Sequence, residues 1–308
     1  MNLRNLMNKG ESIRPVVLYT LNSEGMEMLD QIEEHACYGG VQRIYKHDSE
    51  TIGLPMRFSV YLPPQARERK VPGLFYLAGL TCTEETFPIK AGAQRFAAQH
   101  GIALIAPDTS PRGANVPGEA EAWDFGVGAG FYVDATREPW SKHWRMYSYV
   151  RDELREAVTA SLPVDGARLG IFGHSMGGHG ALMLALRNPE IYRSVSAFAP
   201  IAAPTRCPWG EKAFSGYLGD DREAWKQYDA SELVSKAAHK FEAGILVDQG
   251  LADAFLPNQL NPDVFEAACK AAGQPLTLRR HEGYDHGYFF IQSFIEDHLA
   301  HHARVLLK

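Results

Sequence analysis

The sequence predicts an α/β fold in which helices cover both faces of a mostly parallel central sheet. Two alternating segments near the start are typical of antiparallel strands, and later short apolar segments alternate with segments of helical periodicity. The motif Gly173-His174-Ser175-Met176-Gly177 stands between a short apolar strand and a helix of small residues. A sharp strand-to-helix turn that exposes a serine requires this context.

Antiparallel strands are predicted first, over residues 41–47 and 57–62, where apolar and polar side chains alternate. Short apolar segments then predict buried parallel strands. These strands are residues 73–77, 102–106, 169–172, 194–199, 244–248 and 276–280. The predicted helices are residues 90–100, 146–161, 178–187, 224–227, 263–272 and 291–307. A long loop rich in glycine and aromatic residues, 111–139, is expected to serve a functional site, because loops of that length are uncommon in compact domains.

Length and composition exclude several classes of protein. A chain of 308 residues with 45% hydrophobic residues can form one large packed domain. The net charge of −6 lacks the basic excess of nucleic-acid-binding proteins, so no nucleic-acid partner is predicted. The sequence contains no run of 18 apolar residues, so no membrane-spanning helix is predicted. We divide the chain into an N-terminal extension of unknown role, residues 1–34, and a single domain, residues 35–308.

The cysteines and histidines do not indicate a metal site. The four cysteines are Cys37, Cys82, Cys207 and Cys269. They are scattered without a C-x-x-C pair, which favours free thiols in a reducing compartment, the cytoplasm. His298 and His302 are four residues apart, but a solvated helix face explains this spacing better than a shared metal.

Ser175 is the candidate nucleophile. A serine on such a turn adopts a strained backbone conformation, and only small neighbours fit around it. Gly173 and Gly177 supply that space, and Gly178 lets the following helix begin close to the sheet. The N-terminus of that helix then points at the serine hydroxyl.

A serine hydroxyl needs a base to remove its proton, and in this fold the order along the chain is serine, acid, histidine. His286 follows the strand 276–280 and is the candidate base. Asp253 and Asp248 both follow Ser175, and position favours Asp253, which lies in the loop beyond the strand 244–248. Both histidines that flank the serine, His174 and His179, are expected to be structural.

Two backbone N–H groups are needed to stabilise the oxyanion that forms during acyl transfer. The residue after the nucleophile, Met176, supplies one, and the loop after the strand 73–77 supplies the other, which we assign to Leu80. Cys82, in the same loop, is expected to lie close to the site as a packing thiol. The glycines of residues 126–130 do not have the G-x-G-x-x-G spacing and no helix follows them, so nucleotide binding is not predicted.

With these residues assigned, the chain resembles the S-formylglutathione hydrolases, the esterase D family. The matching segments extend over about residues 35–300, and together they are far more specific than any single motif. They are residues 77–83, 107–113, 123–126, 130–136, 173–180, 207–210, 213–219, 248–250, 253, 255–256, 284–286 and 288–290.

The resemblance implies an α/β-hydrolase fold in which Ser175 is the nucleophile, His286 the base and Asp253 its partner. It also implies an oxyanion hole formed by the amides of Leu80 and Met176. The implied reaction is hydrolysis of the thioester S-formylglutathione to formate and glutathione in formaldehyde detoxification, through a formyl-serine intermediate. The resemblance also implies that neither a metal nor an organic cofactor is needed, and that the protein forms a homodimer.

A formyl group is small, so we expect a small acyl pocket. Its candidate lining residues are Cys82, Trp123, Phe131 and Trp209. A general short-chain carboxylesterase with the same three residues and a wider pocket is the alternative function. An acyltransferase, or an inactive hydrolase-like binding protein, is a more distant alternative.

Three features depart from the family pattern. Ala114 stands where the family often has cysteine, and Gly287 stands where it often has serine. Residues 1–34 have no counterpart in the resemblance. None of the three removes a candidate catalytic residue.

Overall fold

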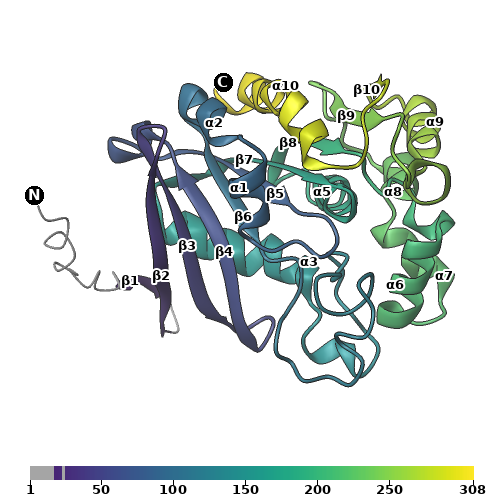
Figure 1. The fold of residues 1–308 in the computed structure, drawn as a ribbon, viewed down its shortest axis with the longest axis horizontal. Helices are drawn as coiled ribbons and strands as arrows, with labels where there is room; N and C mark the ends of the chain where they lie inside the picture. Colours follow the sequence, from purple (N-terminus) through teal and green to yellow (C-terminus); the bar gives the residue numbers. More distant parts are fainter. Residues whose placement is uncertain (1–16, 23–24) are drawn as a thin grey trace, which may run out of the picture.

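The computed structural model describes residues 17–22 and 25–308, and the side chains from residue 29 onward. Ten strands form a single sheet within these residues, in the order β1-β2-β3-β4-β6-β5-β7-β8-β9-β10 (Figure 1). The strands are β1 (Val17–Asn22), β2 (Gly25–Cys37), β3 (Gly40–Ser49), β4 (Leu54–Leu62), β5 (Val71–Leu77), β6 (Ala103–Pro107), β7 (Val164–His174), β8 (Tyr192–Phe198), β9 (Ile245–Gly250) and β10 (Leu276–His281).

Helices connect the parallel strands. The α-helices are α1 (Thr86–Lys90), α2 (Gln94–His100), α3 (Met146–Ser148), α4 (Arg155–Ser161), α5 (Met176–Arg187), α6 (Pro208–Leu218), α7 (Arg222–Trp225), α8 (Ala230–Lys236), α9 (Pro262–Ala272) and α10 (Tyr288–Leu306). Short 3₁₀ segments are η1 (Pro64–Arg67), η2 (Trp140–Lys142), η4 (Pro204–Arg206) and η5 (Lys226–Tyr228), and π-helical segments are η3 (Tyr149–Leu154) and η6 (Leu256–Leu260).

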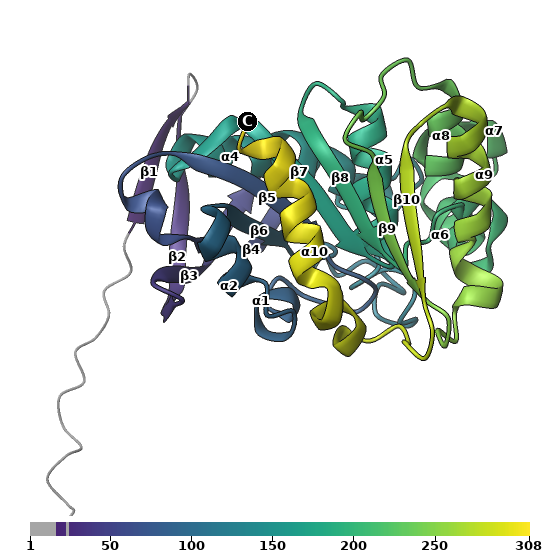
Figure 2. The ribbon, with the colours of Figure 1, turned by 90° about the horizontal axis from the view of Figure 1, so that it is seen from above.

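The sheet has an antiparallel part and a parallel part. Strands β1 to β4, and the pair β4 with β6, are antiparallel. From β6 to β10 all five neighbouring pairs are parallel. Helices α1, α2 and α10 cover one face of the sheet, and α4, α5, α8 and α9 cover the other (Figure 2). The predicted fold class is therefore confirmed. No helix in the described part of the chain is long and apolar enough to cross a membrane.

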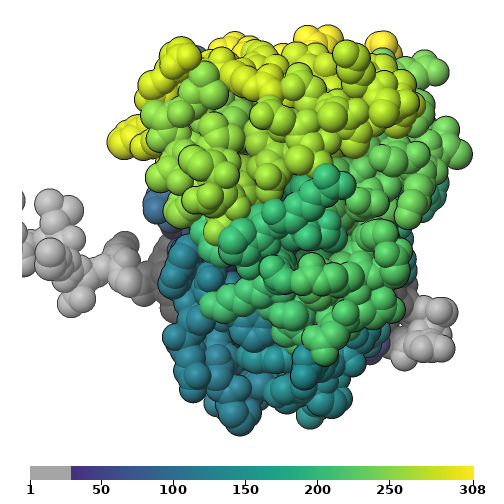
Figure 3. Space-filling model, turned by 90° about the vertical axis from the view of Figure 1, so that its right-hand side faces the viewer, coloured from purple at the N-terminus to yellow at the C-terminus, as the bar shows by residue number. Residues whose placement is uncertain are grey.

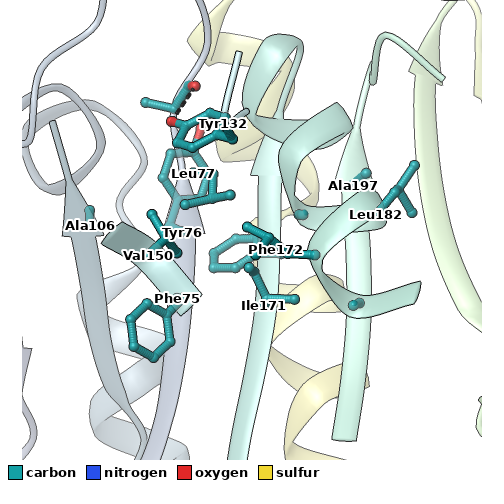
Figure 4. Packing of buried hydrophobic residues seen from close by; sticks show 14 of the residues in the cluster. Phe75, Tyr76, Leu77, Ala106, Tyr132, Val150, Ile171, Phe172, Leu182 and Ala197 are labelled. Atoms are coloured by element: carbon teal, nitrogen blue, oxygen red, sulfur yellow. Dashed lines mark hydrogen bonds between the residues drawn. The ribbon is translucent and has the colours of Figure 1, made fainter. Parts of the chain in front are cut away.

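The core lies around the central parallel strands. All seven residues of β5 are buried, because helices cover both faces of this strand. Figure 4 shows Phe75 and Tyr76 of β5 beside Phe172 of β7. The ring of Tyr76 stacks on Phe87 of α1 at 3.8 Å between centroids and meets Phe172 edge-on at 4.9 Å. This packing holds the carboxyl ends of β5 and β7 side by side, where the candidate nucleophile lies.

Most predicted elements are present, but most strands are longer than predicted and the helix ends are shifted. The helix predicted for residues 146–161 forms as α3, the π-helical η3 and α4 in succession, and α5 begins at Met176 rather than Gly178. Sequence reasoning missed α6 and α8, which follow β8. Figure 3 shows the face where these helices lie, with the segment of residues 200–240 in green between the long loop below and later segments above.

The two N-terminal strands were also missed. The predicted boundary between residues 34 and 35 falls inside β2, while residues 1–16 lie outside the described residues. From Asp30 to Ala36, β2 is mostly exposed, so its side chains show no apolar alternation. Backbone hydrogen bonds to β3 hold this polar strand, with a register shift between Gln31 and Glu33.

The prediction that His298 and His302 lie on a solvated helix face is wrong, because both side chains are fully buried between α10 and the sheet. Nδ1 of His298 lies 2.8 Å from Ser196 Oγ, and Nε2 lies 3.3 Å from an oxygen of Asp248. The His302 ring joins Ser194 Oγ at 2.7 Å and Ser196 Oγ at 2.9 Å. Small hydroxyl side chains on β8 thus satisfy the buried rings, a pairing that the periodicity of α10 alone does not reveal.

Buried histidines should make folding sensitive to acid. Burial lowers the pKa of five of them, and it lowers the pKa of His179 and His301 to about 4. The other three are His174, His298 and His302. In the unfolded chain a histidine has a pKa of about 6.5, so below that pH the unfolded chain binds more protons and the free energy of unfolding falls.

We therefore expect urea unfolding to show stability that falls between pH 6.5 and about pH 4, by up to about 1.4 kcal/mol per pH unit for each proton taken up. The variant His302→Gln should reduce this slope by about one proton. A stability that does not change over this range would contradict the assignment.

Candidate active site

Ser175 lies at the turn between β7 and α5 in a strained backbone conformation. Its φ of 58° and ψ of −119° are rare for a residue with a side chain. The Ser175 N–H donates to the carbonyl of Phe198 at 3.0 Å, and the Ser175 carbonyl accepts from the N–H groups of His179 at 3.0 Å and Ile201 at 3.2 Å. These bonds from β8, α5 and the following loop hold the strained residue in place.

The turn fits against the end of β5 only because two glycines flank the serine. A Cβ atom at Gly173 would lie 2.2 Å from the carbonyl oxygen of Gly177. A Cβ atom at Gly177 would lie 1.9 Å from the carbonyl oxygen of Leu77, the last residue of β5. Any larger residue at either position would push the turn away from the strand.

His286 and Asp253 meet beyond the carboxyl ends of the strands. Nδ1 of His286 lies 2.5 Å from Oδ2 of Asp253. The Asp253 side chain is fully buried, and it also accepts from the N–H of Phe255 at 2.8 Å and the Gln249 amide at 3.3 Å. Since Nδ1 is engaged by the carboxylate, Nε2 is the ring nitrogen left to exchange a proton.

The His286 ring lies beside the serine turn. Its centroid is 4.4 Å from that of His174, the residue before Ser175, and the Phe255 ring meets it edge-on at 4.9 Å. Within the described residues the Ser175 hydroxyl makes no hydrogen bond, and Asp253 is the hydrogen-bond partner of the His286 ring. In free enzymes the nucleophile–base hydrogen bond is often long and shortens only when substrate binds.

Asp248, the other candidate acid, is engaged elsewhere. It is fully buried in β9 and accepts from Nε and Nη2 of Arg279 at 2.6 and 2.5 Å. Burial opposes ionisation of Asp248, but hydrogen bonds from His298 and Arg279 outweigh it and lower the pKa of this carboxyl below its ordinary value. The structure therefore places Asp253, and not Asp248, next to His286.

The predicted oxyanion donors are the N–H groups of Leu80, which follows Gly79, and of Met176, which follows Ser175. Gly79 contacts the nucleophile closely, since a Cβ atom at this position would lie 3.2 Å from Ser175 Cβ. In the described part of the chain neither the Leu80 nor the Met176 N–H donates to another backbone group. The Met176 N–H is also the first of α5, so it belongs to the N–H groups that a helix leaves free.

The glycine-rich segment 126–130 supports the loop that carries Leu80. The carbonyl of Gly128 accepts from the N–H of Thr81 at 2.8 Å, and the Gly128 N–H donates to Ser110 Oγ at 2.7 Å. Tyr132 further along donates from its hydroxyl to the carbonyl of Ala78 at 3.0 Å. Sequence reasoning missed these supports, although Thr81, Ser110 and Tyr132 lie in segments that carry the family resemblance.

The aromatic pocket candidates lie at different depths. Trp209 is buried, and its ring lies 4.7 Å from that of Phe255, which contacts His286. Trp123 is 55% exposed and meets Trp209 edge-on at 5.6 Å. These aromatic side chains extend from the surface to the His286 ring.

The other two candidates are Phe131 and Cys82. Phe131 is fully buried and packs against His179 and Phe214, with centroids 6.2 and 6.5 Å away. Cys82 is partly buried, and burial raises the pKa of its thiol. No group of three or more histidine, cysteine, aspartate or glutamate side chains that could hold a metal occurs in residues 29–308.

Comparison with known proteins places this chain in a family. The family described as "Putative esterase" matches residues 49–301. The S-formylglutathione hydrolase of Mus musculus is 57% identical over 279 residues, which cover 90% of this chain and 99% of the mouse protein. The S-formylglutathione hydrolase of Arabidopsis thaliana is 56% identical over 280 residues, covering 90% and 98%.

A solved structure supports the same family assignment. The structure of an S-formylglutathione hydrolase from Agrobacterium tumefaciens superposes with a TM-score of 0.87 at 48% sequence identity, covering 90% of this chain and 99% of that one. Identity at this level over nearly the whole length of the relatives leaves no room for a different family. The chain belongs to the S-formylglutathione hydrolase family of esterases.

Proposed function

We propose that the protein hydrolyses the thioester S-formylglutathione to formate and glutathione. Ser175 is the nucleophile, His286 the general base, and Asp253 the group that orients the base. The observation that carries this proposal is the 2.5 Å contact between His286 Nδ1 and Asp253 Oδ2 beside the strained turn of Ser175. The name shared by the relatives supports the choice of substrate.

In the first half of the reaction, Ser175 Oγ attacks the formyl carbon and its proton passes to His286 Nε2. The carbonyl oxygen becomes an oxyanion, which accepts hydrogen bonds from the N–H groups of Leu80 and Met176. The C–S bond then breaks, leaving formyl-Ser175 and glutathione, whose sulfur takes the proton from His286. A thiol has a pKa of about 8.5, so this leaving group needs little help from the imidazolium.

In the second half, water attacks the formyl-serine. His286 accepts one proton from the water, and the same two N–H groups stabilise the second oxyanion. Collapse of this intermediate breaks the bond to Ser175 Oγ, which regains its proton from His286, and the product leaves as formic acid, which ionises to formate at neutral pH. Asp253 stays ionised throughout and stabilises the imidazolium through Nδ1–H.

Acyl specificity depends on the space around the serine. A formyl carbon carries only hydrogen, so a pocket limited by Trp209, Phe131 and Cys82 would exclude longer acyl chains. A wider pocket would make the protein a general short-chain carboxylesterase with the same three catalytic residues. The observation that favours this second candidate is the exposure of Trp123 beside Trp209. It leaves the outer end of this pair of aromatic side chains open to solvent.

We also propose a cytoplasmic homodimer in which residues 35–308 are the catalytic domain. The free cysteines support a reducing compartment, since all four are described and none is in a disulfide. The homodimer rests on the family resemblance alone.

The first test is turnover of S-formylglutathione beside p-nitrophenyl esters of increasing acyl length. We expect the formyl thioester to have the highest kcat/KM and the esters to fall steeply with chain length. The variant Ser175→Ala should abolish turnover of all substrates while unfolding like the wild type. Turnover of butyryl esters that matches or exceeds that of the thioester would instead establish the general carboxylesterase.

The two candidate acids, the buried Asp253 and Asp248, offer a matched pair of variants that tests which of them orients His286. Asp253→Asn should lower kcat by about 10⁴-fold, because an asparagine no longer stabilises the imidazolium or selects its tautomer. Asp248→Asn should lower the midpoint of thermal unfolding with much less effect on the kcat of the folded protein, since Asp248 contacts Arg279 rather than His286. Equal losses of kcat in the two variants would contradict the assignment of Asp253.

A further inference from the structure

The turn that carries Leu80 is strained and needs support from outside. The Cys82 N–H bonds back to the carbonyl of Gly79 at 3.3 Å, which closes a four-residue turn around Leu80 and Thr81. Thr81 has a φ of +67°, a conformation that is unfavourable for a β-branched residue. Such a residue keeps this conformation only where its surroundings enforce it.

The carbonyl at the end of this turn accepts two side-chain hydrogen bonds. The Cys82 oxygen accepts from Thr109 Oγ1 at 2.6 Å and from Arg112 Nη2 at 3.3 Å. Both donors come from the loop that follows β6, and neither contacts the catalytic residues directly in this structure. They hold the Cys82 peptide, and through it the strained turn, against the loop after β6.

Arg112 is itself held by a buried carboxylate. Its Nε donates to Oδ2 of Asp108 at 2.6 Å and its Nη2 to Oδ1 at 2.9 Å, so the guanidinium forms a two-pronged pair. Asp108 is only 4% exposed, and it also accepts from the Thr109 N–H at 2.6 Å. One carboxylate therefore orients both groups that donate to the Cys82 carbonyl.

A second ion pair anchors the far end of the same loop. Arg57 Nε lies 2.7 Å from Oε1 of the buried Glu84, and Arg57 Nη2 donates to Glu85 at 3.0 Å. The carbonyl of Glu84 accepts from Ser59 Oγ at 2.8 Å. Burial and the nearby charge of Asp108 raise the pKa of the Glu84 carboxyl. The loop is thus fixed at both ends.

We propose that Arg112, oriented by Asp108, is a positioning residue that fixes the Leu80 amide for oxyanion stabilisation before substrate binds. The proposal rests on the proposed function, in which the Leu80 amide is an oxyanion donor. Arg112 acts through the Cys82 carbonyl and the strained Thr81 turn. Because the oxyanion exists only in the transition state and intermediate, loss of this support should lower kcat and leave KM nearly unchanged.

The test compares Arg112→Gln and Arg112→Lys with the wild type. We expect Arg112→Gln to lower kcat by about 10- to 100-fold, somewhat less than the 10²- to 10³-fold cost of removing an oxyanion donor outright. Inhibition by an alkylboronic acid, which forms a tetrahedral adduct on serine, should weaken by a similar factor. The kcat of Arg112→Lys should fall between those of the wild type and Arg112→Gln, because lysine keeps the charge beside Asp108 but cannot form the two-pronged pair.

A control variant and a second test variant separate an effect on positioning from an effect on stability. Arg168→Gln removes a guanidinium whose Nε lies 2.7 Å from Asp165, a pair on β7 remote from the Leu80 turn, and should leave kcat unchanged. Thr109→Val removes the other donor to the Cys82 carbonyl and should lower kcat in the same way as Arg112→Gln. It also tests the proposal if Arg112→Gln fails to fold.

Three outcomes would overturn the proposal. A raised KM with unchanged kcat would mean that Arg112 binds the substrate. A lower unfolding temperature with wild-type kcat and boronic acid affinity would mean a purely structural pair. A loss of kcat without weaker boronic acid binding would place the effect outside the oxyanion hole. The kinetic and inhibition measurements are repeated with p-nitrophenyl acetate, so absence of thioester hydrolysis in the wild type would overturn the proposed substrate without affecting this comparison.

Discussion

The site depends on a backbone contact between the end of β5 and the turn after β7. The Leu77 carbonyl approaches Gly177 so closely that no Cβ atom fits there, and Gly79 also lies close to Ser175, where a Cβ atom would be 3.2 Å from the serine Cβ. This contact places the nucleophile and both proposed oxyanion donors within one rigid region. The buried aromatic packing of Tyr76 and Phe172 beneath it keeps the two strand ends from moving apart.

Ion pairs between buried carboxylates and partly exposed arginines hold the loops around that contact. Asp108 with Arg112, and Glu84 with Arg57, fix the loop after β5, while Asp248 with Arg279 and His298 fixes the sheet behind the acid. Such pairs add little net stability, because burying charges costs most of what their attraction returns. Their contribution here is geometric, since each pair sets the position of a backbone segment that carries a functional group.

The sequence was informative where chemistry restricts the local choice of residue. A strained serine turn requires Gly173 and Gly177, and the chain order of serine, acid and histidine left His286 with Asp253 or Asp248 as its partner. Position favoured Asp253, and the structure brings Asp253 and His286 together. Burial of His298 and His302 could not be predicted, because their partners Ser194 and Ser196 lie about a hundred residues away in sequence. The polar strand β2 was missed for a similar reason, since its pairing with β1 and β3, and not its side-chain pattern, makes it a strand.

The most direct test of this account is a crystal structure of the protein with a boronic acid bound to Ser175. We expect one adduct oxygen about 3 Å from the amide nitrogens of both Leu80 and Met176. The backbone of residues 78–82 and 173–177 should coincide with that of the free protein, because the site is formed before substrate binds. An adduct oxygen bound by other donors, or a loop that moves to reach it, would contradict the account.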